Sequence, residues 1–260
     1  MKEILIACAV VSGVGLLAGI MLTVFSKLFA VPVDETAEKI NAVLPGANCG
    51  GCGYSGCSGY ADAVAAGTAP LNLCSVGGPE VAAKIGEITG KSVAAEEKRI
   101  AVINCGGNNS ATKKRFDYKG INSCAAASLV HGGDSACEYG CLGYGDCVSA
   151  CDFNALSLVD GLPTVCKELC TSCGKCTKVC PKGLMKLKPF SKAHTVACSS
   201  KLVGGKQRKI CTAGCIGCGK CAKVCPSAAI KVDSNLAKID YSVCTSCGLC
   251  RDNCPVHCIT

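Results

Sequence analysis

The sequence contains one cysteine pattern twice, with the two copies 74 residues apart. When the chain is shifted by this distance, nine cysteines fall on nine other cysteines without a gap. Such a repeat indicates one structural unit present in two copies, and it limits the fold to architectures that contain this unit twice. The nine pairs are Cys124 and Cys198, Cys137 and Cys211, Cys141 and Cys215, Cys147 and Cys221, Cys151 and Cys225, Cys170 and Cys244, Cys173 and Cys247, Cys176 and Cys250, and Cys180 and Cys254.

The run C-x2-C-x2-C-x3-C-P occurs complete at residues 170–181, 215–226 and 244–255. In this run three cysteines of one loop bind one [4Fe-4S] cluster, and the fourth, just before the proline, binds the neighbouring cluster. Paired runs therefore predict paired clusters. For the second copy we predict one [4Fe-4S] cluster on Cys215, Cys218, Cys221 and Cys254 and another on Cys244, Cys247, Cys250 and Cys225.

The first run of the first copy departs from this pattern, because Tyr144 stands where the second copy has Cys218. Cys137, four residues before Cys141, is the natural replacement, and its equivalent Cys211 is then a spare thiol. For the first copy we predict one cluster on Cys137, Cys141, Cys147 and Cys180 and another on Cys170, Cys173, Cys176 and Cys151.

A fifth group of cysteines precedes the repeat, in the glycine-rich segment that contains NCGGCGYSGC. Its spacing is C-x2-C-x4-C-x16-C, and glycines let the backbone wrap closely and turn its N–H groups toward sulfur. Zinc is the alternative for four such cysteines, but the neighbouring ferredoxin-like runs favour iron and sulfur. We predict a [4Fe-4S] cluster on Cys49, Cys52, Cys57 and Cys74.

Seven cysteines remain outside these five predicted clusters, out of 27 in the chain. A further site built from Cys105, Cys124, Cys198 and Cys211 is an alternative to the commoner role of buried free thiols, which we favour. The other three are Cys8, Cys166 and Cys258.

Residues 4–26 are almost wholly apolar, with Lys2 and Lys27 on either side. A helix of these 23 residues, at about 1.5 Å per residue, is long enough to cross a hydrocarbon core of about 30 Å. A secretory signal is the alternative, but the apolar run is longer than usual for one, and export would carry the thiols into an oxidising compartment. We predict a single membrane span with the clusters on the cytoplasmic side.

These features predict an α+β chain whose folding depends on its clusters, since the sequence has no tryptophan and only 4% aromatic residues. Helices are expected at 31–44, 61–66 and 79–88, and a strand at 99–105. The predicted domains are a transmembrane anchor at 1–27, a small [4Fe-4S] domain at 28–100, a connecting segment at 101–136, a bacterial-type 2[4Fe-4S] ferredoxin-like unit at 137–188, a linker at 189–210, and a second such unit at 211–260.

Electron transfer is the function that this pattern predicts. The sequence shows no nucleotide-binding glycine loop, no nucleophile–base set and no acid pair, so we expect no substrate-transforming site and no catalytic residue in this chain. The net charge of +8 is concentrated partly in two basic runs, at 182–192 and 201–209. A solvated face is the default interpretation, but a basic rim beside clusters would also attract an acidic electron carrier; nucleic acid is disfavoured.

The chain resembles the B subunit of the Rnf complex over essentially its whole length. The resemblance is carried by the single N-terminal apolar span, NCGGCGYSGC and Cys74, YKGINSCAAA, CEYGCLGYGDCVSAC and CTSCGKCTKVCPKGL. It implies a bacterial inner-membrane ferredoxin:NAD⁺ oxidoreductase that exports Na⁺ or H⁺. In that complex a chain of this kind would accept electrons from soluble ferredoxin, while nicotinamide, flavins and the ion path belong to sister subunits. The alternative is a membrane-anchored iron–sulfur subunit of a different reductase.

Overall fold

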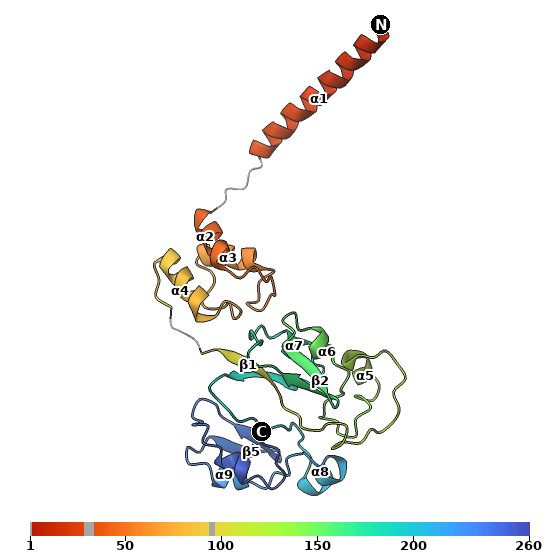
Figure 1. The fold of residues 1–260 in the computed structure, drawn as a ribbon, viewed down its shortest axis with the longest axis vertical. Coiled ribbons are helices and arrows are strands. Elements are labelled where there is room, and N and C mark those ends of the chain that lie inside the picture. The colour runs from red at the N-terminus through yellow and green to blue at the C-terminus, as the bar shows by residue number, and fades with distance from the viewer. Residues whose placement is uncertain (1, 29–33, 94–96) are drawn as a thin grey trace.

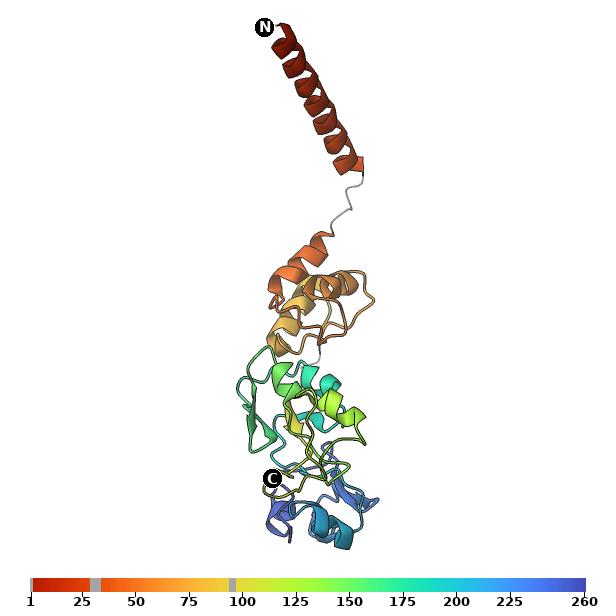
Figure 2. The same cartoon turned by 90° about the vertical axis from the view of Figure 1, so that its right-hand side faces the viewer.

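The structure is a computed structural model that describes residues 2–28, 34–93 and 97–260; within the first helix it describes the side chains of 2, 12–26 and 28. Below this helix, the parts of the chain follow one another in sequence order along the long axis (Figures 1 and 2). The helical part with α2, α3 and α4 comes first, then the part with β1 and β2, and the part with β5 and α9 lies at the far end.

The N-terminal segment is the helix α1, Lys2–Leu28. No helix within the described residues meets the length and apolarity needed to cross a membrane. The predicted span at 4–26 is therefore not confirmed, and part of it, including the Cys8 side chain, lies outside the described side chains.

The next part folds into three helices, α2 (Glu35–Val43), α3 (Cys57–Ala65) and α4 (Gly78–Thr89). Asp34 caps α2 by accepting the backbone N–H of Thr36 at 2.8 Å. Pro79 lies in the first turn of α4, where its missing N–H costs no helix hydrogen bond. All three helices were predicted, although the start of the first prediction, 31–33, lies outside the described residues. Ile40, Tyr60 and Ile85, each at most 1% exposed, form the core between them.

The two copies of the repeat adopt the same local structure, as the sequence predicts. Each copy has a short helix, a two-stranded antiparallel hairpin and a second short helix, and corresponding elements begin 74 residues apart. The first copy contains α6 (Asp146–Ser149), β2 (Leu156–Val159), β3 (Leu162–Val165) and α7 (Lys175–Val179). The second contains α9 (Lys220–Lys223), β5 (Ile230–Asp233), β6 (Leu236–Ile239) and α10 (Leu249–Asp252).

Each copy is closed by a strand from the segment that precedes it. The predicted strand is present as β1 (Arg99–Ile103), which pairs antiparallel with β4 (Met185–Pro189), so that Ile103 lies opposite Met185. In the second copy Val196 forms an antiparallel bridge with Ile259, which is 74 residues after Met185. Ile103 and Val196 therefore hold equivalent positions. The remaining helices are α5 (Cys124–Leu129) and α8 (Gly204–Ile210).

Candidate metal centres

Five hollows in the described part of the chain are each lined by at least four cysteines. Their volumes are similar, at about 270 to 390 Å³ including the part open to solvent. Every cysteine whose side chain is described is a free thiol. Five cysteine-lined spaces of similar size in one small chain indicate five places for the same kind of group.

The hollow of the helical part brings together the four cysteines predicted for it, Cys49, Cys52, Cys57 and Cys74. Asn48 holds its loop, because the Asn48 Oδ1 accepts the backbone N–H of Cys57 at 2.8 Å. The backbone N–H of Gly77 points at the Cys74 sulfur, 3.4 Å away.

A second predicted set also lines one hollow, in the first copy of the repeat. Its cysteines are Cys151, Cys170, Cys173 and Cys176. The strand β1 contributes a backbone donor, since the N–H of Ala101 lies 3.4 Å from the Cys170 sulfur. Burial raises the pKa of the Cys176 thiol to about 12, so iron has to displace its proton.

In the second copy, Cys215, Cys218, Cys221 and Cys254 line one hollow as predicted, and Cys258 lines it as well. The Cys258 sulfur lies 3.9 Å from that of Cys254. The other predicted set also lies close together. Cys250 is buried, the thiols of Cys244 and Cys247 are near enough to raise its pKa further, and Cys225 packs against the same core.

The structure differs from the sequence prediction at the irregular run of the first copy. The hollow that contains Cys141, Cys147 and Cys180 is completed by Cys124, and Cys137 lines a different hollow. Burial raises the pKa of Cys147 to about 11, and the nearest thiols that add to this shift are those of Cys124 and Cys180. Cys124 therefore occupies the place that the sequence assigned to Cys137.

Asp146 holds Cys124 in this place. Its carboxylate accepts the backbone N–H groups of Cys124 and Ala125, at 2.8 and 2.9 Å, and the Ser123 hydroxyl at 2.9 Å. These bonds fix the start of α5 directly beside Cys147. The second copy has Lys220 in place of Asp146, so the presence of this one acid is the sequence signal that could have revealed the different partner.

Cys137 lies with three of the cysteines left over by the sequence analysis, Cys105, Cys198 and Cys211. All four side chains are buried, with exposed fractions of 5 to 8%. Cys105 follows β1, Cys137 lies in the loop before α6, and Cys211 ends α8. Three of these four had been grouped in the alternative set of the sequence analysis, in which Cys124 took the place of Cys137.

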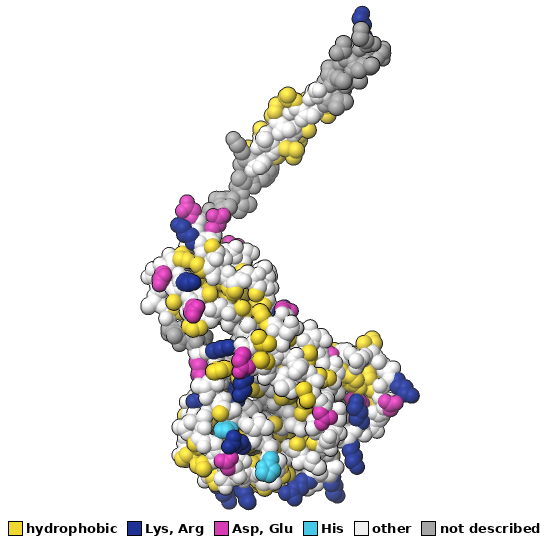
Figure 3. Space-filling view, in the orientation of Figure 1, with side chains coloured by type: hydrophobic (Ala, Val, Ile, Leu, Met, Phe, Trp, Pro, Cys, Tyr) yellow, Lys and Arg dark blue, Asp and Glu magenta, His cyan; other side chains and the backbone are white. Residues whose placement is uncertain are grey.

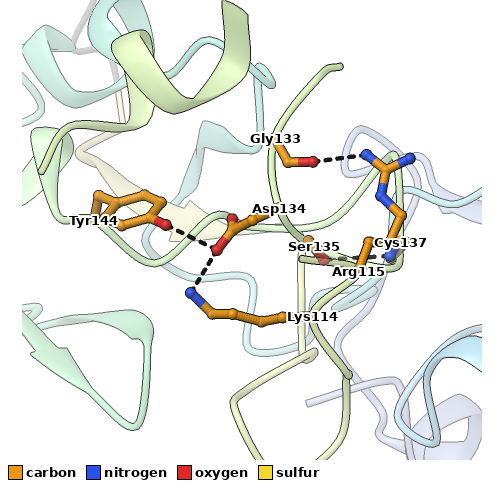
Figure 4. Close-up of polar contacts among 7 residues, drawn as sticks. All are labelled: Lys114, Arg115, Gly133, Asp134, Ser135, Cys137 and Tyr144. Atoms are coloured by element: carbon orange, nitrogen blue, oxygen red, sulfur yellow. Dashed lines mark hydrogen bonds and ion pairs between the residues drawn. The ribbon is translucent and has the colours of Figure 1, made fainter. Parts of the chain in front are cut away.

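A buried carboxylate holds the loop that carries Cys137 and Cys141 (Figure 4). Asp134 is 1% exposed, and its Oδ2 accepts the Lys114 ammonium at 2.6 Å and the Tyr144 hydroxyl at 2.8 Å. Burial by itself would raise the pKa of Asp134, but the hydrogen bonds from Lys114 and Tyr144 lower it below its usual value. Tyr144, which replaces a ligand cysteine of the second copy, therefore has a structural role in the first.

The cysteines suit clusters held by thiolates. Backbone N–H groups lie 3.4 Å from the sulfurs of Cys74, Cys105, Cys170, Cys180 and Cys244, and such bonds stabilise a negatively charged sulfur. Within the described residues, no three His, Cys, Asp or Glu side chains are gathered closely enough to hold a single metal ion. The sulfurs instead surround the hollows.

Comparison with known protein families agrees with this arrangement. Residues 214–258 and 169–230 each match a family described as "4Fe-4S dicluster domain", and residues 44–76 match one described as "Putative Fe-S cluster". The α+β fold and the cysteine-lined hollows thus define a ferredoxin-like iron–sulfur protein.

The similar proteins include three of nearly equal identity, each the B subunit of its complex. The chain is 44% identical to that of the proton-translocating ferredoxin:NAD(+) oxidoreductase complex of Clostridium ljungdahlii, over 94% of this chain and 87% of that protein. It is 41% identical to that of the Na(+)-translocating ferredoxin:NAD(+) oxidoreductase complex of Acetobacterium woodii, over 100% and 78%. It is 43% identical to that of the ion-translocating oxidoreductase complex of Methanosarcina acetivorans, over 98% and 97%. The chain belongs to this family, the B subunits of the Rnf complex.

Proposed function

We propose that this chain is the electron-relay subunit of a membrane-bound complex that couples electron flow between reduced ferredoxin and NAD⁺ to the translocation of Na⁺ or H⁺. The names of the three relatives support the reaction. When bound, each [4Fe-4S] cluster accepts and donates one electron, and the chain itself positions the clusters. The other subunits of the complex hold the nicotinamide site and the ion path.

The observation that carries this proposal is the close succession of the cysteine-lined hollows. A methyl group at Gly51 would lie 2.9 Å from the backbone oxygen of Cys173, so the loop of the first hollow touches the loop of the next. Within the first copy, Cys147 and Cys151 from the two hollows both lie near Cys176. Within the second copy, Cys221 and Cys250 belong to one buried core.

We assign five ligand sets to five clusters, four of them unchanged from the sequence prediction. The changed set follows the lining of the hollow, with Cys124 in place of Cys137. The five sets are Cys49, Cys52, Cys57 and Cys74; Cys151, Cys170, Cys173 and Cys176; Cys124, Cys141, Cys147 and Cys180; Cys215, Cys218, Cys221 and Cys254; and Cys225, Cys244, Cys247 and Cys250.

Electrons enter at the second copy in this proposal. Cys218 and Cys247 are exposed, whereas the other assigned ligands are buried or half-buried. Lys and Arg side chains gather at the same end of the molecule (Figure 3). Residues 201–260 contain nine Lys and Arg against three Asp and no Glu, a net charge of +6 out of +8 for the chain. A basic surface beside an exposed ligand suits an acidic carrier such as ferredoxin.

The apolar N-terminal segment supplies the membrane attachment in this proposal. Its support is the uninterrupted apolar stretch at 4–26 and the need for reduced thiols on the cluster side. The protein is then a single-pass protein of the bacterial inner membrane, with the cluster-binding part in the cytoplasm.

The test uses the intact complex in membranes. Cys57→Ala is expected to remove about four iron atoms per chain, one cluster's worth, and to slow NAD⁺ reduction by reduced ferredoxin. Cys166→Ala is the matched control, because Cys166 is exposed and lines none of the five hollows. The proposal fails if ferredoxin does not bleach the visible absorbance of the wild-type chain, or if the chain co-purifies with a different reductase.

A further inference from the structure

The four cysteines that the five proposed clusters leave in one hollow come from both halves of the molecule. Cys105 and Cys137 belong to the segments around the first copy, and Cys198 and Cys211 lie just before the second. Their hollow measures about 270 Å³, including its open part, against about 320 to 390 Å³ for the other four. It is thus another space of the same kind, between the two copies.

The four cysteines are arranged as two equivalent pairs. Cys137 and Cys211 are 74 residues apart and occupy the same position of the repeat. Cys105 and Cys198 each follow by two residues the position that pairs with the end of a copy, Ile103 in one case and Val196 in the other. The equivalence of Cys105 and Cys198 comes from strand pairing, because their distances along the chain to Cys137 and Cys211 differ.

Backbone donors repeat the same symmetry. The N–H of Cys141 lies 3.4 Å from the Cys105 sulfur. Burial raises the pKa of Cys198, and the backbone N–H of Cys215, the repeat equivalent of Cys141, faces its sulfur and opposes that shift. Each copy therefore presents one ligand-bearing loop to this hollow through the same kind of bond.

The interior of the hollow is shaped for a bound group. A methyl group at Gly107 would lie 3.3 Å from the Cys211 sulfur, 3.6 Å from that of Cys105 and 2.5 Å from the Thr112 hydroxyl, so it would fill the space between them. The Thr112 Oγ1 and the Gln207 Oε1 are buried without a hydrogen-bond partner, and both residues line the hollow. Gln207 is only 1% exposed. Buried polar atoms without a partner are rare and need an explanation.

We propose that Cys105, Cys137, Cys198 and Cys211 bind a sixth [4Fe-4S] cluster, which connects the clusters of the first copy with those of the second. The site rests on the proposed function and completes it. On one side Cys105 contacts Cys141, a ligand assigned to the first copy. On the other side Cys198 shares a buried core with Cys215, a ligand assigned to the second. A series of sites then extends from the exposed Cys247 loop to the Cys49 loop.

The test counts metal in the full-length chain, prepared without oxygen in its complex. The wild type is expected to hold about 24 iron atoms per chain, against about 20 for five clusters, with no stoichiometric zinc. Cys137→Ser and Cys211→Ser should each lose up to about four iron atoms, or convert one cluster to a three-iron form with its own EPR signal. Cys166→Ser, which alters an exposed thiol outside the hollows, should keep the full count.

Two further variants test the site without removing a ligand. Gly107→Ala should lose the same iron as Cys137→Ser, because its methyl group would occupy the cluster's space. Thr112→Val should keep all the iron and lower the midpoint potential of one cluster, because it removes a buried hydroxyl that can donate to cluster sulfur.

The outcomes that overturn the proposal are separate from those that overturn the proposed function. A wild type with about 20 iron atoms, and the same count in Cys137→Ser, would show that no sixth cluster exists. One zinc per chain that Cys137→Ser removes would replace the cluster with a structural ion. Loss of iron in Cys137→Ser without loss in Cys124→Ser would return Cys137 to the ferredoxin-like set. Each result leaves reduction by ferredoxin to be measured independently.

Discussion

Asp134→Ala tests how the loop with Cys137 and Cys141 is held. The substitution removes the only acceptor shared by Lys114 and Tyr144 among the described contacts. Lys114 is 54% exposed, so its ion pair contributes no more than about 1 kcal/mol after solvent screening. The hydrogen bond from Tyr144 to a buried charge contributes about 1.5 to 3 kcal/mol, and relief from burying the carboxylate offsets part of the total. We expect a net local cost of about 2 kcal/mol, or about 30-fold in the opening equilibrium.

Hydrogen exchange of the cluster-loaded protein measures this opening. The relevant amides are those of Arg115, which donates to the Asp134 carbonyl at 2.7 Å, and Ala136, which donates to the Lys113 carbonyl at 2.8 Å. Both should exchange about 30-fold faster in Asp134→Ala, because the side chain stabilises the contact in which they lie. Asp117→Ala is the control on the same segment, since Asp117 is 84% exposed and its pair with Lys119 is on the surface.

The sign of the pH dependence follows from the lowered pKa of Asp134. A group whose pKa is lower in the folded state contributes its stability above the unfolded value of 3.8, and loses it as the pH falls through the folded value. The difference between wild type and Asp134→Ala should therefore stay constant from about pH 5 to pH 8. A change of less than about threefold in both amides, or an equal effect of Asp117→Ala, would refute the reasoning.

Three other substitutions test the remaining parts of the relay. Tyr60→Phe removes a buried hydroxyl that donates to the Pro70 carbonyl at 2.8 Å and accepts the Leu73 N–H at 3.2 Å; it should cost about 1.4 kcal/mol, seen as about tenfold faster iron release from the Cys49–Cys74 site under mild chelation. Gly51→Ala should slow reduction of the N-terminal cluster at unchanged iron content, because its methyl group would press on the Cys173 backbone. Replacing both Lys220 and Lys223 by Glu should raise the KM for ferredoxin about tenfold and weaken its dependence on salt.

Matched controls exist for each of these changes. Tyr54→Phe alters a half-buried ring whose centroid is 5.6 Å from that of Tyr60, and it should leave iron release unchanged. Gly205→Ala adds a methyl group that meets nothing within 4 Å, and it should leave the reduction rates unchanged. Lys84→Glu changes an exposed charge on α4, far along the chain from the second copy, and it should leave the KM unchanged.

Much of the local structure could be predicted from the sequence because it depends on short-range spacing. The run from Cys170 to Cys180 and its repeat form the same loops and short helices, since three ligands on one turn leave the backbone few alternatives. The helices around Tyr60 and Ile85 were predicted from periodicity and from Pro79 at a helix start. Residues that are neighbours in the chain decide these features.

The pairing of ligands across the chain could not be predicted in the same way. The gapless shift places Cys124 beside Cys198, yet strand pairing makes Cys105 the structural equivalent of Cys198. An inserted segment before Cys137 lets α5 reach back, and Asp146 then holds Cys124 next to Cys147. Spacing along the chain carries no information about which loop completes a site from a distance.

The amino-acid sequence by itself determined the repeat, the ferredoxin-like runs and the family, because each depends on the order of cysteines along short loops. Only the tertiary structure decided that Cys124 joins the first copy and that Cys137 lies between the copies with Cys105, Cys198 and Cys211. The physical reason is that these ligands come from segments far apart in the chain. Their positions are fixed by β1, by the Asp146 and Asp134 carboxylates and by burial between the copies.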